Sequence, residues 1–350
     1  MDSIRDWFRR HFSNPQVVAL GIVLVVGFAL VMTVGDMLAP VLASLVIAYL
    51  LDGLVDALGR RGVRRSLAMT LVFLMFLAAL MFTVFGILPR LSNQLTQLIQ
   101  QFPDMVARGQ EALRLLPEKY PNFISEEQIS QVFAALRTEL GGLGQRVLSW
   151  SVASLMGFMM VLVYMILVPM LVFFFLKDKT EILDWLSGYL PRERALSALV
   201  WHDVDRQLGN YVRGKVWEIL VVGVASYVVF RLMGLQYAVL LATLVGLSVI
   251  IPYIGALVVT FPVVVIAYFQ WGWSGEFAWL VTAYLIIQGL DGYVLVPLLF
   301  SEVVNLHPIA IIVAVLLFGG LWGFWGVFFA IPLATLVQAV LKAWPRTLAA

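Results

Sequence analysis

One carboxylate inside a long apolar run is the sharpest candidate for chemistry in this chain. Asp291 lies within the run 277–299, and an acidic residue near the centre of such a run costs about 2.5–3.5 kcal/mol on membrane-insertion scales. Tyr284, Gln288 and Asp291 recur at helical spacing, which predicts one helix face carrying a hydroxyl, an amide and a carboxylate. Such a face could line a path for cations or protons. Alternatively, Asp291 lies near the interface in a shorter span, or pairs structurally with Arg231.

The apolar run 237–270 predicts a broken helix. Its length exceeds the roughly 20 residues of one perpendicular span and falls short of the roughly 40 that two spans need. Pro252, which has no backbone N–H, and Gly255, which permits a tight reversal, interrupt the run on either side of Tyr253. We expect two short helices in a re-entrant or broken hairpin, a place where transporters commonly coordinate substrates or ions.

The last apolar run, 309–341, also exceeds one span. It holds 33 residues without a charge, or about 50 Å of helix. The glycine-rich stretch 319–326, which includes Gly320 and Gly323, predicts a second break within it. These glycines either contribute to a substrate pathway or only permit close packing of helices.

Charged residues at the ends of apolar runs are further candidates for coupling or gating. Arg213, Lys215 and Glu218 cluster at the expected inner end of a fifth apolar run, 216–233. They either take part in gating or form a surface pair whose side chains reach toward the membrane interface. His307, at the start of the last run, either relays protons or begins the helix that follows.

The composition of the chain indicates a protein that folds in lipid. Of its 350 residues, 62% are hydrophobic and 13% are charged, and the mean hydropathy is +0.95, whereas soluble domains are about 25% charged. The net charge of +2 argues against a nucleic-acid partner. With no cysteine, the chain has neither disulfides nor thiolate sites.

Enzymatic signatures are absent from the sequence. It contains no His-Glu-x-x-His, Gly-x-Ser-x-Gly, P-loop or dinucleotide-binding glycine pattern. We therefore expect a protein that is not an enzyme and that holds no cofactor or metal.

The order of apolar and polar segments predicts an all-α, polytopic membrane helix bundle of about eight helices, with broken or re-entrant helices in its C-terminal half. Arginine clusters before residue 17 and in the 56–66 loop indicate that both of these segments are cytoplasmic. We expect a turn between the first two runs, marked by Gly35, Asp36 and Pro40.

Three regions follow from this pattern. Residues 1–89 form transmembrane helices 1 to 3, and residues 90–150 form a polar, helical, extracytoplasmic insertion. Residues 151–350 form the transmembrane core. The core includes a cytoplasmic amphipathic segment, 177–215, which fits a helical hairpin on the membrane surface, and the broken helices 237–270 and 309–341.

Five short motifs, strongest between residues 173 and 335, carry a resemblance to a known family. They are Phe174-Phe175-Leu176-Lys177-Asp178, Gly209-Asn210-Tyr211-Val212-Arg213-Gly214, Ile251-Pro252-Tyr253-Ile254-Gly255, Leu306-His307-Pro308 and Ala330-Ile331-Pro332-Leu333. With these motifs the chain resembles the autoinducer-2 exporter (AI-2E) family, which includes PerM-like permeases. The resemblance covers almost the whole chain. In the polar insertion it is confined to the general layout.

The resemblance implies an eight-helix permease in the bacterial inner membrane, with both termini cytoplasmic. Family members are associated with export of a quorum-sensing signal or with exchange of sodium or lithium for protons. Homo-oligomers, pentamers among them, are also implied. The family's Pro-Tyr-x-Gly break matches residues 252–255, its Gln-x-x-acid pattern matches residues 288–291, and its His-Pro pair matches residues 307–308.

Together these observations predict a permease that moves a small solute or signal molecule across the inner membrane by alternating access around the broken C-terminal helices. Two alternatives stay open. The first is an antiporter that exchanges sodium or lithium for protons at Asp291. The second is an oligomeric membrane scaffold or passive pore. The expected partners are the lipid bilayer, the solute or a monovalent cation with protons, and further copies of the chain.

Overall fold

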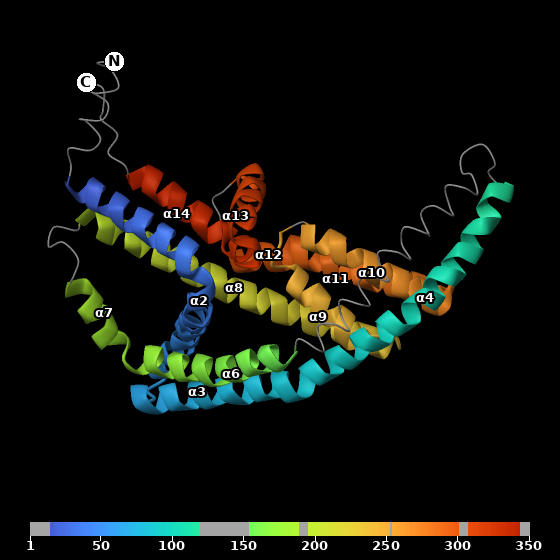
Figure 1. Cartoon of the computed structure of the whole chain (residues 1–350), viewed down its shortest axis with the longest axis horizontal. Helices are drawn as coiled ribbons and strands as arrows, with labels where there is room; N and C mark the ends of the chain where they lie inside the picture. The colour runs from blue at the N-terminus through green and yellow to red at the C-terminus, as the bar shows by residue number, and fades with distance from the viewer. Residues whose placement is uncertain (1–14, 120–153, 189–194, 253, 301–306, 344–350) are drawn as a thin grey trace, which may run out of the picture.

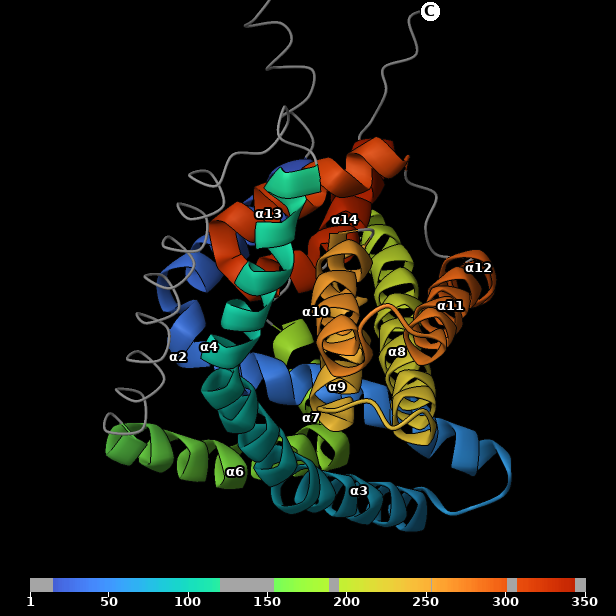
Figure 2. The same ribbon diagram turned by 90° about the vertical axis from the view of Figure 1, so that its right-hand side faces the viewer.

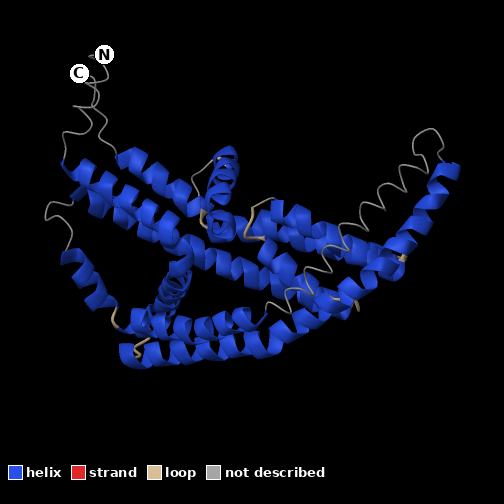
Figure 3. Cartoon of the chain, viewed as in Figure 1, coloured by secondary structure: helices blue, strands red, loops and turns tan. Residues whose placement is uncertain are grey.

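The computed structural model describes residues 15–119, 154–188, 195–252, 254–300 and 307–343. Every regular element in these ranges is a helix, and no strand occurs among them (Figure 3). The elements, in chain order, are α2 (Pro15–Arg60), α3 (Arg65–Phe82), η1 (Thr83–Ile87), α4 (Leu88–Lys119), α6 (Ser154–Lys177), α7 (Lys179–Gly188), α8 (Ala195–Leu232), α9 (Ala238–Ser248), α10 (Ile254–Trp271), α11 (Gly275–Leu290), η2 (Asp291–Leu295), α12 (Val296–Phe300), α13 (Pro308–Phe328) and α14 (Ala330–Ala343).

Four of these helical stretches are long and apolar enough to cross a membrane, by length and composition. They are 37–60, 65–109, 254–271 and 275–300. The pair α6 and α7, bent by 77°, makes a fifth if it is one span, and α9 and residues 309–323 are shorter apolar helices. These helices confirm a polytopic membrane protein of the all-α class.

The first element, α2, is one long helix instead of two spans joined by a turn. Its 46 residues correspond to about 70 Å of helix, more than twice the thickness of a bilayer core. Its ribbon bends within its length (Figure 1). The predicted turn at residues 35–40 is therefore wrong: Pro40 lies inside the helix, and loss of one backbone donor bends a helix without ending it.

The predicted boundary between residues 89 and 90 also falls inside continuous helix. The elements α3, η1 and α4 follow one another without a loop from Arg65 to Lys119. The middle element, η1, is a π-helix, the wider helical form that usually occurs as a single inserted turn. Residues 120–150 of the predicted insertion lie outside the described residues.

Helix α8 is also continuous where the sequence predicted two separate segments. It runs from Ala195 to Leu232, so the amphipathic segment predicted to end at residue 215 and the apolar run predicted to begin at 216 belong to one helix. The antiparallel neighbour α9 crosses α8 where two glycines meet. A Cβ on Gly246 would lie 3.0 Å from the Cα of Gly223, so only glycine allows the two backbones this close, as in other small-residue crossings in membranes.

The predicted break in the run 237–270 is confirmed. Helix α9 ends at Ser248 and α10 begins at Ile254. The chain turns so tightly between them that a Cβ on Gly255 would overlap the carbonyl oxygen of Ser248. Glycine is therefore required at position 255 by a close backbone approach.

The predicted break in the last run is confirmed too. Gly323 interrupts α13 with φ 57° and ψ −132°, a backbone conformation that residues with a Cβ rarely adopt. The chain folds back there, and a Cβ on Gly326 would overlap the carbonyl oxygen of Phe318. Helix α14 follows and packs against both α13 and α8.

The C-terminal helices form one group around α8. Helices α9 and α11 contact α8, and α10 contacts both α9 and α11, as the views in Figures 1 and 2 show. Helices α3 and α6 lie side by side along another edge and contact α2. Three apolar clusters hold the described residues together, and the largest unites α8, α9, α10 and α11 around Leu241, Val263 and Tyr284.

We predict that Gly255→Ala destabilises the folded protein by about 3 kcal/mol, because the new methyl group would overlap the carbonyl oxygen of Ser248 and the turn would have to shift. Loss of native protein after heating in detergent, followed by size-exclusion chromatography, measures the effect. Gly289→Ala is the matched control, since a Cβ there meets nothing within 4 Å. Equal melting of the two variants would contradict the tight turn.

Candidate functional site

A buried ion pair on α8 faces the end of α9. The Nζ atom of Lys215 lies 2.8 Å from Oε2 of Glu218, and their side chains are 5% and 2% exposed. The two residues are three apart on the helix, which places them on one face. The alternative of a surface pair is therefore wrong, because both charges are enclosed by protein.

Lys215 also satisfies a backbone carbonyl at the break between α9 and α10. Its ammonium donates a hydrogen bond of 2.7 Å to the carbonyl oxygen of Val249, the residue that follows α9. A helix that stops leaves its last carbonyls without a backbone donor, and in lipid an unsatisfied carbonyl costs several kcal/mol. The same ammonium lies 5.3 Å from the centre of the Phe300 ring, within the range of a cation–π contact.

Asp291 supplies a second carboxylate to this region. It is 9% exposed and opens the π-helix η2, which contacts α8. Asp291 interacts electrostatically with Lys215 and with Glu218. Its Oδ1 atom is buried and has no hydrogen-bond partner among the described residues. Arg231, the cation considered as its structural partner, is exposed near the far end of α8.

Lys215, Glu218 and Asp291 therefore form a charged site, hereafter the lysine site, with one cation against two carboxylates. Burial makes this imbalance expensive, since a charge in a low-dielectric interior is stable only when paired or neutralised. The free oxygen of Asp291 is the position where a proton or a cation would restore balance.

An apolar cluster closes over the lysine site and joins the two breaks. Phe300 packs against Tyr211, with ring centres 5.7 Å apart, and both belong to a cluster with Phe318 of α13. Ile251, from the first break, packs against this cluster. The two interrupted runs, about 70 residues apart in sequence, thus converge beside Lys215.

The predicted polar face on α11 is confirmed for two of its three members. Gln288 donates to the hydroxyl of Tyr284 at 2.8 Å, and that hydroxyl lies 3.0 Å from Oγ1 of Thr260 on α10. Tyr284 is fully buried in the largest apolar cluster. Asp291 instead interacts with the charges of α8, so the hydroxyl and amide tie α11 to α10 while the carboxylate serves the lysine site.

The remaining break residues have different surroundings. Pro252 is half-buried within the first break, and Tyr253 lies outside the described residues. Gly323 makes the reversal in α13, whereas Gly320 is exposed and a Cβ there would meet nothing within 4 Å.

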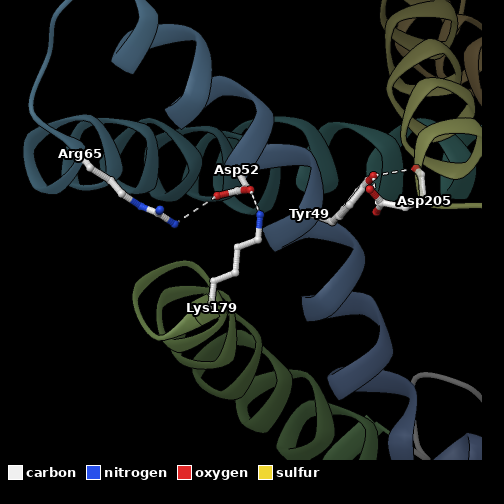
Figure 4. Close-up of polar contacts among 5 residues, drawn as sticks. All are labelled: Tyr49, Asp52, Arg65, Lys179 and Asp205. Atoms are coloured by element: carbon white, nitrogen blue, oxygen red, sulfur yellow. Dashed lines mark hydrogen bonds and ion pairs between the residues drawn. The ribbon is translucent and has the colours of Figure 1, made fainter. Parts of the chain in front are cut away.

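The contacts of Arg213 and His307 lie outside the lysine site. Arg213 is exposed and its guanidinium sits 5.7 Å from the centre of the Tyr49 ring. Tyr49 joins α2 to α8 through hydrogen bonds to the backbone and the carboxylate of Asp205, at 2.9 and 3.0 Å (Figure 4). His307 is the N-cap of α13, with Nδ1 accepting from the amide of Ile309 at 3.3 Å, and so begins the helix that follows it.

A second set of charges fastens the same end of α2. Asp52 lies between Lys179, at 2.6 Å, and Arg65, at 3.9 Å, so it joins α2 to α7 and α3 (Figure 4). The arginine-rich end of the bundle is thus held by ion pairs between separate helices.

Reasoning from the sequence grouped Lys215 with Glu218 but did not place the pair inside the protein. The spacing of the two residues indicated a pair, but the depth of that pair depends on α8 continuing unbroken and on α9 stopping opposite it. The available signal was the long apolar stretch after Glu218, which could have placed the pair inside a helix instead of at its end.

We predict that Lys215→Met lowers the free energy of unfolding by about 3–5 kcal/mol, because it leaves the buried Glu218 carboxylate without its ion-pair partner and the Val249 carbonyl without its donor. The double variant Lys215→Met/Glu218→Gln is expected to recover part of that loss, since neutralising both partners removes a stranded charge. Thermal denaturation of the parent, both single variants and the double variant gives the coupling energy. Strictly additive effects would refute the pair.

Known proteins resemble this chain over nearly its whole length. The model of the family described as AI-2E family transporter matches residues 20–346. The chain is 46% identical over 345 residues to the putative permease PerM of Escherichia coli, covering 99% of this chain and 98% of that protein. It is 25% identical over 342 residues to the putative transport protein YueF of Bacillus subtilis, covering 94% and 92%. These matches span nearly the whole length of the proteins compared, and the chain belongs to the AI-2E transporter family.

Proposed function

We propose that this protein is a bacterial inner-membrane permease that moves a small solute by alternating access at the lysine site. The observation that carries the proposal is the bond from the Lys215 ammonium to the Val249 carbonyl at the end of a broken helix. Interrupted helices at membrane depth are tolerated where protein or a water-filled cavity satisfies the freed backbone groups. In transporters such breaks lie at the substrate site.

The contacts of the lysine site could be exchanged between the two states of an alternating-access cycle. Lys215 has two direct partners, Glu218 on its own helix and the Val249 carbonyl in the break. The buried carboxylate of Asp291 on η2 is near enough to compete electrostatically for the same ammonium. A solute that binds one of these groups changes which of the others the ammonium holds. Because Val249 and Asp291 lie on different elements, that exchange alters how α9 and η2 are tied to α8.

The family also suggests a solute to test. It takes its name from autoinducer-2, a small polar signal molecule, and a polar solute needs donors and acceptors that replace its water on the way through the membrane. The ammonium, the carboxylates and the break carbonyl offer both kinds of group in one place.

A second candidate function is exchange of a monovalent cation for protons. The specific observation in its favour is the buried Oδ1 of Asp291, which has no hydrogen-bond partner in the described parts of the chain. A carboxylate that binds a proton and a cation by turns would provide obligatory coupling. The site's excess of carboxylates over ammonium favours cations over anions.

For the first candidate, we expect Lys215→Met to reduce saturable uptake of labelled autoinducer-2 into proteoliposomes at least about 10-fold, a loss worth about 1.4 kcal/mol. Arg231→Gln is the matched control, because Arg231 is an exposed cation on the same helix and the change should leave uptake intact. A panel of other small polar solutes extends the assay. A flux that does not saturate and is unchanged in Lys215→Met would favour a passive pore and contradict the proposal.

For the second candidate, we expect Asp291→Asn to abolish sodium- or lithium-driven proton movement, read with a pH-sensitive dye inside proteoliposomes, because the amide cannot exchange a proton for a cation. Asp56→Asn, at an exposed position near the end of α2, should retain the parent's exchange. Unaltered exchange in Asp291→Asn would rule out the carboxylate mechanism.

A further inference from the structure

The contact between α4 and α9 joins the N-terminal half of the chain to the broken hairpin. Helix α4 packs Leu91, Leu98 and Met105 against the largest apolar cluster. These residues recur every seven positions, which places them along one stripe of the helix. Gln94 and Gln101, also seven apart, lie beside that stripe and bond to the first turn of α9.

The first turn of α9 lacks a cap of its own. Its N-cap residue is Tyr237, which has φ 57° and makes no side-chain capping bond. The amide of Leu240 instead donates to Oε1 of Gln94 at 2.8 Å, across 146 residues of sequence. This amide is one of the four that a helix cannot satisfy internally, so α4 provides the cap that local sequence does not.

A second bond from α4 holds the same turn. The hydroxyl of Tyr237 donates to Oε1 of Gln101 at 2.6 Å. From the other side, Gln270 at the end of α10 accepts from the amide of Gln236 at 2.7 Å and donates to the carbonyl of Gly234 at 2.8 Å. Three neutral glutamines thus fix the turn between α8 and α9, two of them from α4.

Helix α4 is joined to α3 by a segment suited to bending. The connection η1 is a π-helix, in which the regular ladder of helical hydrogen bonds is locally changed. Arg90 donates to the carbonyl of Gly86 within it at 2.6 Å. A π-turn between two long helices is a common site of helix bending.

We propose that α4 is a clasp for the broken hairpin: Gln94 and Gln101 hold the start of α9, and α4 turns at η1 to release it when the hairpin moves. The clasp sits at the opposite end of α9 from Lys215, which holds the residue after its last turn. Helix α9 has only 11 residues, so restraints at its two ends together fix its position. The proposal adds a control element to the transport cycle and rests on the proposed function only for its transport readout.

Hydrogen exchange tests the cap without any transported solute. In the purified full chain, Gln94→Ala should raise exchange of the amides in the first turn of α9 at least about 10-fold. Gln94→Glu retains an acceptor oxygen and should keep exchange slow. Gln97→Ala, an exposed glutamine on the same helix, is the matched control. Unchanged exchange in Gln94→Ala would overturn the cap.

Distance measurements and cross-linking test release. The chain has no cysteine, so Gln97→Cys and Leu247→Cys, both at exposed positions, can carry spin labels on α4 and α9 alone. We expect two distance populations in lipid nanodiscs, whose ratio shifts toward the longer distance in Gln94→Ala/Gln101→Ala. A single unchanged distance in both proteins would show a static strut and overturn the clasp, whether or not a transported solute is known.

Cross-linking Gln101→Cys to Tyr237→Cys with a reducible bifunctional thiosulfonate should lower autoinducer-2 uptake at least about 10-fold, and reduction should restore it. The pair Asn93→Cys and Gln97→Cys, both at exposed positions and cross-linked within α4, is the control and should transport at the parent rate. Full uptake by the α4–α9 cross-linked protein would overturn the clasp. Absence of uptake in the unlinked parent would count against the proposed function instead, leaving the exchange and distance results to decide the clasp.

Discussion

A carbonyl group that loses its helical partner inside a membrane needs another donor, and Lys215 is the donor for the break between α9 and α10. Its hydrogen bond to the Val249 oxygen is buried, and its ion pair with Glu218 is buried with it. Lipid offers neither group a replacement. The break can therefore exist only while α8 presents this ammonium at this depth, and the close crossing of α8 and α9 at Gly223 and Gly246 sets that depth.

The same requirement explains why a charged group is retained in an otherwise apolar core. A buried ion pair seldom adds stability over well-packed apolar residues. Here the ammonium has a second task, since it pairs with Glu218 on its own helix and also satisfies the Val249 carbonyl at the break. An interaction shared among competing partners is easily redistributed, which is what a permease needs at the point where its helices are interrupted.

The turn between α8 and α9 and the arginine-rich end of the bundle are held by different kinds of contact. At the turn between α8 and α9 the contacts are neutral, made by glutamines and a tyrosine hydroxyl. At the arginine-rich end, Asp52 pairs with Lys179 and Arg65, and Tyr49 bonds to Asp205. Neutral hydrogen bonds leave no stranded charge when they part, whereas separating ion pairs does. The glutamine end is thus the easier one to open and close.

The sequence by itself determined the medium, the helical class and the two breaks, because each follows from local composition and from the lengths that a bilayer allows. It determined the family as well, through the resemblance carried by its short motifs. It also determined that Tyr284 and Gln288 share a face, since helical spacing is a local property. It could not determine that α2 and α8 run on without a turn, because a proline or a cluster of charges is compatible with both outcomes.

Only the tertiary structure decided where Lys215 lies and what it bonds. The same is true of Gln94, which caps a helix that begins more than 140 residues later. Such partners are chosen by how whole helices pack, and packing depends on contacts between distant segments that no local pattern records.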